Sequence, residues 1–311
     1  MKPKIAVLGS YAQALVITVE RIPVSGETLL GRDYRETYGG KGSDMAVQAA
    51  RLGADVAFVG VVGNDHLGQG FIDLMEREGV DIRRLRTTDE RSTGVGLIIK
   101  DTNGSNIIVV DMGANKLFGI QDVEKSADVL REAQVVLAQL EIPLATSLYG
   151  LGVAKAAHVT TVLNPAPAVD LTGTDLQDVD ILTPNETEAR VLLGLSPNDP
   201  TSNAEIASMI LALGCRAVVM TLGDKGVAVY RLMDGHQTET LTEAWPVAVV
   251  DSNGAGDSFN AALCTGLAEG MELPAAVSFA AATAALCCTD WETVPSYRTR
   301  AQVDAFMNVA S

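Results

Sequence analysis

Short apolar runs that recur along the whole chain are the feature that most constrains its fold. Each run closes on a small, polar or proline residue, and helical patterns separate most of the runs. Residues 55–63 (DVAFVGVVG) are almost continuously apolar, as expected for a strand buried on both faces. This alternation predicts an α/β fold, with a mainly parallel central sheet and helices on both faces. The runs are residues 4–10, 55–63, 134–140, 159–165, 179–185, 215–223 and 246–252.

Two segments break this alternation. Residues 15–38 contain short β-like runs and turn residues where a crossover helix would stand, and residues 93–110 form two β-rich runs around a turn at 101–104. We therefore predict a small β-sheet apart from the main one, serving as a cover over the site or as a dimer surface. The chain is interpreted as one domain, 1–311, whose lid is formed by about 12–38 and 91–112.

The composition argues against several classes of partner. The formal net charge is −16, which repels both nucleic acid and an anionic membrane. The first apolar run is too short for a signal peptide and the cysteines lack metal-binding spacing, so we expect a cytoplasmic protein with buried, reduced thiols. The three histidines lie outside the glycine-rich and acid-rich motifs. Any proton transfer therefore falls to a carboxylate or a lysine.

The stretch AVVDSNGAGDSFNAAL (248–263) places small residues just ahead of a helical pattern. Backbone amides at a helix N-terminus are unpaired and carry partial positive charge, and glycines let an anion approach them closely. Residues 254–256 therefore predict an anion site, for which phosphate is the commonest occupant. Asp257 follows directly. It is either a capping acid or a general base that takes the proton of a hydroxyl as it attacks phosphorus.

A second glycine-rich stretch, TYGGKGSDMAVQAARLGA (37–54), surrounds Lys41 with glycines ahead of another helical pattern. By itself this pattern is often only a tight turn, but two glycine-lined helix starts in one α/β chain favour a binding site. In parallel sheets, ligands bind outside the carboxyl ends of the strands. The polar strand ends are residues 9–10, Glu141, Asn164, Asn185, 221–223 and 251–257.

The segments GGKGSDMA and DSNGAGDSFNAAL resemble the two signatures of the ribokinase-like (PfkB-type) carbohydrate kinases. Further segments match in order and spacing, and the resemblance covers essentially the whole chain: ERIPVSGET, STGVGLII, DMGAN, AQLEIP, LNPAPA, TPNETEA and TLGDKGV. The resemblance implies a three-layer α/β sandwich with a small β lid that often serves as a dimer interface, so a homodimer through the lid is expected. It also implies an ATP-dependent kinase that transfers the γ-phosphate to a hydroxyl of a sugar or sugar derivative.

The resemblance implies roles for individual residues. Asp257 matches the base that deprotonates the sugar hydroxyl, with the anion hole just before it. An Asn-x-x-Glu motif matches the pair that organises Mg²⁺ and the ATP phosphates, partly through water, which suits an ion that prefers oxygen ligands. The matched residues are Gly254, Ala255 and Gly256 in the anion hole, Asn185 and Glu188 near Mg²⁺, Thr221, Gly223 and Gly226 near ATP, and Gly39, Gly40, Lys41 and Glu141 near the sugar.

The sugar-binding positions depart from the family pattern. Ribokinase-like proteins carry an Asn and an Asp, two apart after the first strand, that grip sugar hydroxyls. Ala12 and Ala14 stand in these positions here, and Asp44 replaces a further Asn. Each hydrogen bond lost to a buried hydroxyl matters, at about 1 kcal/mol or more. We therefore expect a bulkier or less hydroxylated substrate than D-ribose.

A second departure follows the late alanine-rich helix. Ribokinases have a glycine there, in a loop that helps to hold a monovalent cation, whereas this chain reads CCTDWETVPS (287–296). Candidate ligands for such a cation remain at Asp251, Asn253 and Ser296. Potassium activation is therefore left as an open expectation.

Two alternatives to a sugar kinase follow from the residues. A nucleoside kinase is one, because an apolar wall at Ala12 and Ala14 could bury a base. A non-catalytic sugar sensor on a kinase fold is the other, because a fold does not fix a function. The intact Asp257 and its anion hole favour a kinase, because a protein that only binds its ligand has no need for a base there.

Overall fold

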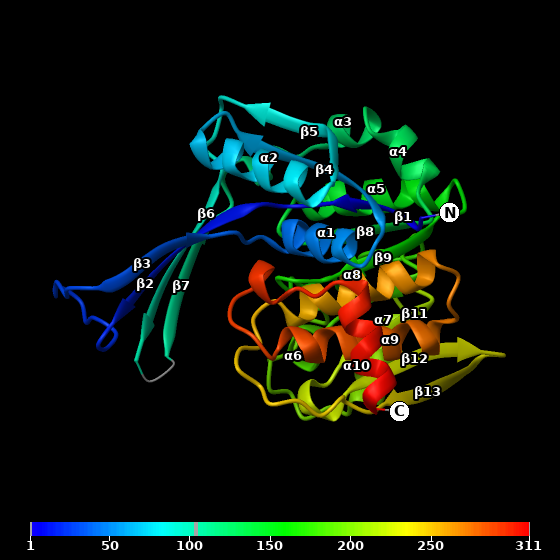
Figure 1. The fold of residues 1–311 in the computed structure, drawn as a ribbon. Coiled ribbons are helices and arrows are strands. Elements are labelled where there is room, and N and C mark those ends of the chain that lie inside the picture. Colours follow the sequence, from blue (N-terminus) through cyan, green and yellow to red (C-terminus); the bar gives the residue numbers. More distant parts are fainter. Residues whose placement is uncertain (1, 103–104, 311) are drawn as a thin grey trace.

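The larger sheet forms the centre of the protein in a computed structural model that describes residues 2–102 and 105–310 (Figure 1). Its strand order is β13-β12-β11-β10-β9-β8-β1-β4-β5. The strands from β11 to β5 are parallel, which confirms the mainly parallel sheet. An antiparallel hairpin of β12 and β13, which the apolar pattern did not predict, extends one edge. The strands are β1 (Lys4–Leu8), β4 (Asp55–Gly63), β5 (Asp81–Thr88), β8 (Val135–Gln139), β9 (Thr160–Asn164), β10 (Ile181–Leu182), β11 (Ala217–Thr221), β12 (Val227–Met233) and β13 (His236–Thr242).

Helices cover both faces of this sheet and confirm the three-layer α/β sandwich. One layer buries side chains such as Met45 and Phe71 against the sheet, and the opposite layer buries Leu151 and Ile210. The first layer contains α1 (Lys41–Arg51), α2 (His66–Glu78), α8 (Ala255–Ala268), α9 (Leu273–Cys287) and α10 (Arg300–Ala310). The second contains α3 (Ile120–Glu124), α4 (Ala127–Glu132), α5 (Leu144–Lys155), α6 (Glu186–Val191) and α7 (Asn203–Leu211). Short 3₁₀ turns are η1 (Gly113–Leu117), η2 (Gly223–Lys225) and η3 (Val294–Ser296).

Local signals in the sequence set the ends of several helices. Asp65 Oδ1 accepts a hydrogen bond of 2.8 Å from the Gly68 N–H at the start of α2, and Gly79 ends that helix with φ at 73°. The alanine-rich run that follows α8 forms the buried helix α9. Within the described ranges, helices of the length and apolarity needed to cross a membrane are absent. The four cysteines are free, and all but Cys288 are buried.

The predicted small sheet projects from one side of the body and carries blue and cyan strands in Figure 1. It has the order β3-β2-β6-β7, with β2 parallel to β6 and antiparallel pairs at both edges. The pairing of β6 with β7 confirms the hairpin, although residues 103 and 104 of its predicted turn lie outside the described residues. The strands are β2 (Ala12–Val19), β3 (Arg32–Thr37), β6 (Gly94–Asp101) and β7 (Asn106–Asp111).

The strand expected over residues 246–252 is wrong. This segment runs outside the sheet, where the side chain of Val249 is 66% exposed and the Val250 N–H donates to Cys288 O at 2.8 Å. The reason is that β12 already occupies the edge position next to β11. The apolar run instead leads the chain back to the carboxyl ends of the parallel strands, where α8 begins.

Candidate active site

A cavity of about 230 Å³ lies where the parallel strands end and α8 begins. Strands β9, β10 and β11 bring polar side chains to this edge, as their parallel direction requires. The amino-terminal turns of α1 and α8 close the opposite side. The lining residues are Lys41, Asn164, Thr183, Asn185, Glu188, Thr221, Ser252, Asn253, Gly254, Gly256, Asp257 and Asn260.

The start of α8 has the geometry of an anion site. Gly254 caps the helix with φ at 77°, and a Cβ there would lie 2.8 Å from Tyr297 Oη and 2.9 Å from Thr293 Cγ2, so only glycine fits. Open space surrounds the position where a Gly256 Cβ would stand. Gly254 and Gly256 line the cavity, whereas the N–H of Ala255 donates to Ser252 O at 3.3 Å. Of the three residues predicted to form the anion hole, Gly254 and Gly256 are therefore the two whose backbone an anion in the cavity could approach.

Asp257 lies in the first turn of α8 and is 7% exposed. Its Oδ1 has no hydrogen-bond partner among the described residues, and Lys41 Nζ lies 3.5 Å away. Burial is the main cause that raises the pKa of Asp257 to about 6; Lys41 opposes this shift, and the charge of Glu141 adds to it. A buried carboxyl group with this pKa can accept a proton near neutral pH.

Lys41 opens helix α1 and is held from its backbone. The Lys41 N–H donates to Glu141 Oε2 at 2.8 Å, and the same oxygen accepts from Ser10 Oγ at 2.6 Å. The charge of Asp257 is the main cause that raises the pKa of the Lys41 ammonium, with Glu141 acting in the same direction. Lys41 therefore stays cationic at neutral pH, next to the carboxylate that it faces.

The predicted sugar-side residues come together at the joint between β2 and α1. A Cβ on Gly40, whose φ is 91°, would lie 2.8 Å from Ala12 N, and one on Gly39 would lie 3.8 Å from Ala14 Cβ. Gln13, between the two alanines, is buried and hydrogen-bonded to the Tyr11 hydroxyl. The wall formed by Ala12 and Ala14 therefore consists of methyl groups, while the polar side chain between them is directed to another partner. Of the predicted sugar-side residues, Lys41 is the one that lines the cavity.

Asp44 lies in the first turn of α1 and is 3% exposed. Its Oδ1 accepts no hydrogen bond within residues 2–102 and 105–310. Burial raises the pKa of Asp44 well above its usual range, and the charges of Asp257 and Glu141 act in the same direction. A ligand group that donates a hydrogen bond could therefore pair with Asp44 Oδ1.

Asn185 and Glu188 form a capping box at the start of α6. The Glu188 N–H donates to Asn185 Oδ1 at 2.8 Å, and the Asn185 N–H donates to Glu188 Oε2 at 2.9 Å. Both residues line the cavity, and burial raises the pKa of Glu188. The two hydrogen bonds of the capping box do not use Glu188 Oε1. An oxygen ligand facing a cavity that could also take phosphate groups fits Mg²⁺, which keeps several waters.

The predicted nucleotide-side residues divide into two groups. Thr221 ends β11, forms a bridge with Asn185 and lines the cavity. Gly223 and Gly226 flank the η2 turn with φ at 62° and 100°. A Cβ on Gly226 would lie 2.0 Å from Thr242 O, so that glycine is required by the packing of the β12–β13 hairpin. Thr221 is thus the residue of this set that the cavity includes.

Sequence reasoning missed a chain of hydrogen bonds beneath the anion site. Asn164 Nδ2 donates to Thr183 O at 3.0 Å, and Thr183 Oγ1 donates to Asn260 Oδ1 at 2.6 Å. Asn260 Nδ2 in turn donates to Gly256 O at 2.8 Å. The chain ties two strand ends to the first turn of α8. A usable signal was the spacing of Asn260, which stands three residues after Asp257 on an otherwise apolar helix.

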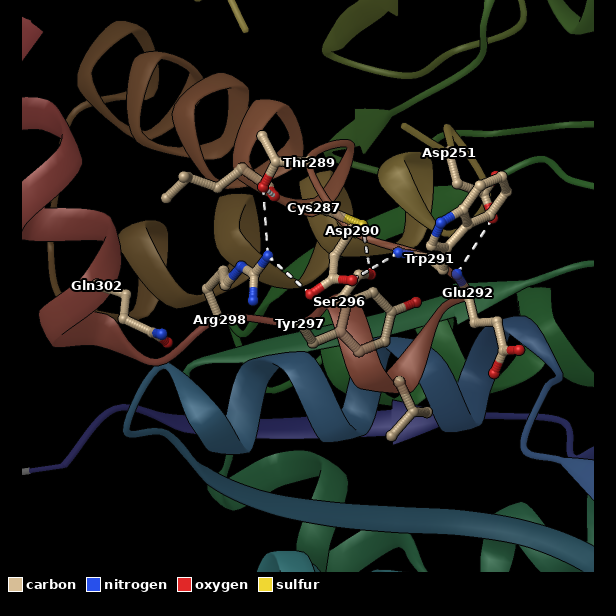
Figure 2. A network of polar contacts seen from close by, with 12 residues as sticks. Asp251, Cys287, Thr289, Asp290, Trp291, Glu292, Ser296, Tyr297, Arg298 and Gln302 are labelled. Carbon is tan, nitrogen blue, oxygen red and sulfur yellow. Dashed lines mark hydrogen bonds and ion pairs between the residues drawn. The ribbon is translucent and has the colours of Figure 1, made fainter. Parts of the chain in front are cut away.

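The candidate cation ligands belong to one polar network (Figure 2). Asp251 Oδ1 accepts from the Asn253 N–H at 3.0 Å, and Asp251 Oδ2 accepts from the Glu292 N–H at 3.1 Å. Ser296 Oγ donates to Thr293 O and lies 3.1 Å from the sulfur of Cys287. The side-chain oxygens of Asp251 and Ser296 therefore already form hydrogen bonds within the protein, and the Cys287 thiol lies next to Ser296.

The fold and the site together define a phosphotransferase: an α/β sandwich with a glycine-lined helix N-terminus, a buried carboxyl group and polar side chains at its strand ends. The model of the pfkB family of carbohydrate kinases matches residues 2–300, and the chain belongs to this family. As a member it is an ATP-dependent kinase that acts on a sugar hydroxyl.

Individual relatives agree over most or all of the chain. The ribokinase of Haemophilus influenzae is 36% identical over 310 residues, which cover 100% of both chains. The ribokinase of Mus musculus is 39% identical over 265 residues, 85% of this chain and 81% of that protein. The structure of Arabidopsis thaliana ribokinase complexed with ribose and ATP superimposes with a TM-score of 0.88 at 30% identity, covering 99% of both chains.

The raised pKa of Asp257 predicts the acid limb of the pH profile. A base must be ionised to act, so kcat/KM should be constant above about pH 7 and fall tenfold per pH unit below about pH 6, where Asp257 is protonated. Initial rates between pH 4.5 and 8, with substrate well below KM, give this limb. A limb near pH 4, the range of an ordinary aspartate, would contradict the burial argument.

Proposed function

We propose that Asp257 is the general base of phosphoryl transfer from ATP to the sugar hydroxyl. The hydroxyl proton passes to Asp257 while the hydroxyl oxygen bonds to the γ-phosphorus, and the bond from that phosphorus to the bridging oxygen breaks to release ADP. The observation that carries this role is the position of Asp257, buried in the first turn of α8 and lining the cavity.

The groups around Asp257 support the same step. The N–H groups at Gly254 and Gly256 would stabilise charge on the transferring phosphoryl group, because they lie at a helix N-terminus and face the cavity. Lys41 would hold the negative charge of the transferred group close to Asp257. The chain Asn164–Thr183–Asn260 would keep the first turn of α8 fixed as this charge develops.

Two ions were expected, and they fit to different degrees. Mg²⁺ fits Glu188 and Asn185, which would hold it partly through water; when bound, it would neutralise charge on the ATP phosphates. A monovalent cation fits poorly at Asp251, Asn253 and Ser296. Both carboxylate oxygens of Asp251 already accept backbone N–H groups, and Ser296 Oγ contacts the Cys287 thiol.

Replacing Asp257 by Asn tests the proposed base. Asn has nearly the same shape but cannot accept the proton, so kcat should fall by about 10²–10⁴-fold while the Kd for Mg-ATP stays the same. Coupled ADP release measures kcat, calorimetry measures the Kd, and thermal unfolding checks that the fold is retained. Turnover within a few-fold of the parent would remove Asp257 from the mechanism.

On the substrate, we propose a sugar or sugar derivative that lacks polar groups where Ala12 and Ala14 lie and that donates a hydrogen bond toward Asp44. The methyl wall and the buried Oδ1 of Asp44 support this choice. An ADP-release screen over pentoses, hexoses, polyols, sugar acids and nucleosides identifies the substrate. The nucleosides in this screen test the alternative of a nucleoside kinase, which the apolar wall favours, against a sugar kinase.

The variant Ala14→Asp should change the preference between substrates. A carboxylate there can accept from ribose hydroxyls, and such charge-assisted bonds contribute about 1.5–3 kcal/mol. The same charge would stand unpaired against the apolar group of the true substrate. We expect the kcat/KM ratio of D-ribose to the best substrate to rise about tenfold or more, with the uncharged control Ala14→Asn changing it less. A parent that already prefers ribose would contradict this interpretation of the wall.

We further propose that the protein is a cytoplasmic homodimer joined through the small sheet. Leu97 and Val109 are in register across β6 and β7, yet they are 51% and 60% exposed. Exposed apolar side chains on neighbouring strands favour an interface between copies. Sedimentation should give a dimer for the parent and a monomer for Val109→Lys; a parent that sediments as a monomer would exclude this interface. The four free cysteines support the cytoplasmic location, which cell fractionation would test.

A further inference from the structure

Residues 290–293, after α9, lie directly against the loop that leads into α8. Figure 2 shows Trp291 and Glu292 beside Asp251. The Glu292 N–H donates to Asp251 Oδ2 at 3.1 Å, and Asp251 Oδ1 accepts from the Asn253 N–H at 3.0 Å. Thr293 Cγ2 lies 2.9 Å from the position that a Cβ on Gly254 would take. The backbone that leads to the anion site is therefore held from the segment 290–293.

The same segment also contacts the small sheet. Arg35 Nε and Glu292 Oε1 form an ion pair at 2.8 Å, and Lys100 Nζ lies 5.6 Å from the centre of the Trp291 ring. Thr293 Oγ1 donates to Tyr38 O at 3.3 Å. Strands β3 and β6, and the turn after β3, are thus each joined to the segment 290–293.

Strand register shows which face of the small sheet makes these contacts. Arg35 pairs with Val16, and Lys100 pairs with Thr18. Val16 and Thr18 alternate with Ala14 along β2, so all three point to one face. Arg35 and Lys100 therefore stand on the same face as the substrate wall at Ala14. The segment 290–293 therefore meets the face of the small sheet on which Ala14 stands.

The backbone of Glu292 indicates that the contacts on both sides hold it in place. Its φ is 68°, in the left-handed region that side chains other than glycine rarely adopt. Such a conformation persists where the surroundings determine it. Here the surroundings are Asp251 on the side of α8 and Arg35 on the side of the small sheet.

We propose that Glu292 is a positioning residue that couples the small sheet to the anion site. With the sheet over the substrate, the Arg35–Glu292 ion pair orders the backbone of Glu292, and its N–H fixes Asp251 and the loop into Gly254. Phosphoryl transfer is then favoured when substrate is covered. This proposal rests on the proposed function, because the anion site is assigned there.

A double-mutant cycle on Arg35→Gln and Glu292→Gln tests the coupling. Each single variant should lower kcat about two- to fivefold, as expected for a half-exposed ion pair, with KM for ATP unchanged. The double variant should be no slower than either single one. The exchanged pair, Arg35→Glu with Glu292→Arg, should recover part of the loss. Arg32→Gln is the matched control, because Arg32 lies on the same strand and pairs only locally with Asp33.

Unchanged kcat in both single variants, or losses that multiply in the double variant, would overturn the coupling. Thermal unfolding of each variant separates a folding defect from a loss of kcat. Because the Arg35 side chain is 44% exposed, Arg35→Gln should fold and still test the coupling even if Glu292→Gln is unstable. The parent distinguishes the two proposals. An inactive parent contradicts the proposed function, whereas an active parent with unaffected variants contradicts only the role of Glu292.

Discussion

The approach of two helix N-termini is the constraint on which the rest of the site depends. Helices α1 and α8 pack against each other and bring Lys41 Nζ to 3.5 Å from Asp257 Oδ1. Their glycines permit this arrangement. A Cβ on Gly42 would lie 2.3 Å from Gly9 Cα, so a side chain there would push α1 away from the end of β1. Two partial positive charges and one base therefore converge on a single point at the sheet edge.

Burial of acids around this point has a chemical consequence. Asp44 and Asp257 are both nearly inaccessible to solvent, and burial is the main cause that raises the pKa of each; the charge of Glu141 acts in the same direction on both. Lys41 pairs with Asp257 at 3.5 Å, and its charge also favours the ionised form of Asp44. Buried acids destabilise a folded chain where their burial is not fully compensated, and such groups concentrate at functional sites. Substrate and nucleotide supply what these acids lack, so binding is expected to stabilise the protein.

The protein divides its tasks between its two sheets. In the proposed function, the edge of the large sheet carries the chemistry, through Asp257, Asn185 and Glu188, which line one cavity. The small sheet carries the substrate wall, and there the chain departs from the pattern at Ala12 and Ala14. Because the departure does not involve Asp257 or the start of α8, a change of substrate is a simpler account of it than a loss of catalysis.

The sequence by itself determined the parallel α/β sandwich, the small sheet and the two glycine-rich helix starts, because period, glycine and charge are local properties of a chain. It did not predict that residues 246–252 leave the sheet, since nothing local shows that β12 already fills the edge. Only the tertiary structure decided the pKa of Asp257, the chain from Asn164 to Gly256 and the contact of Glu292 with Arg35. These depend on distances between residues far apart in sequence, which folding alone sets.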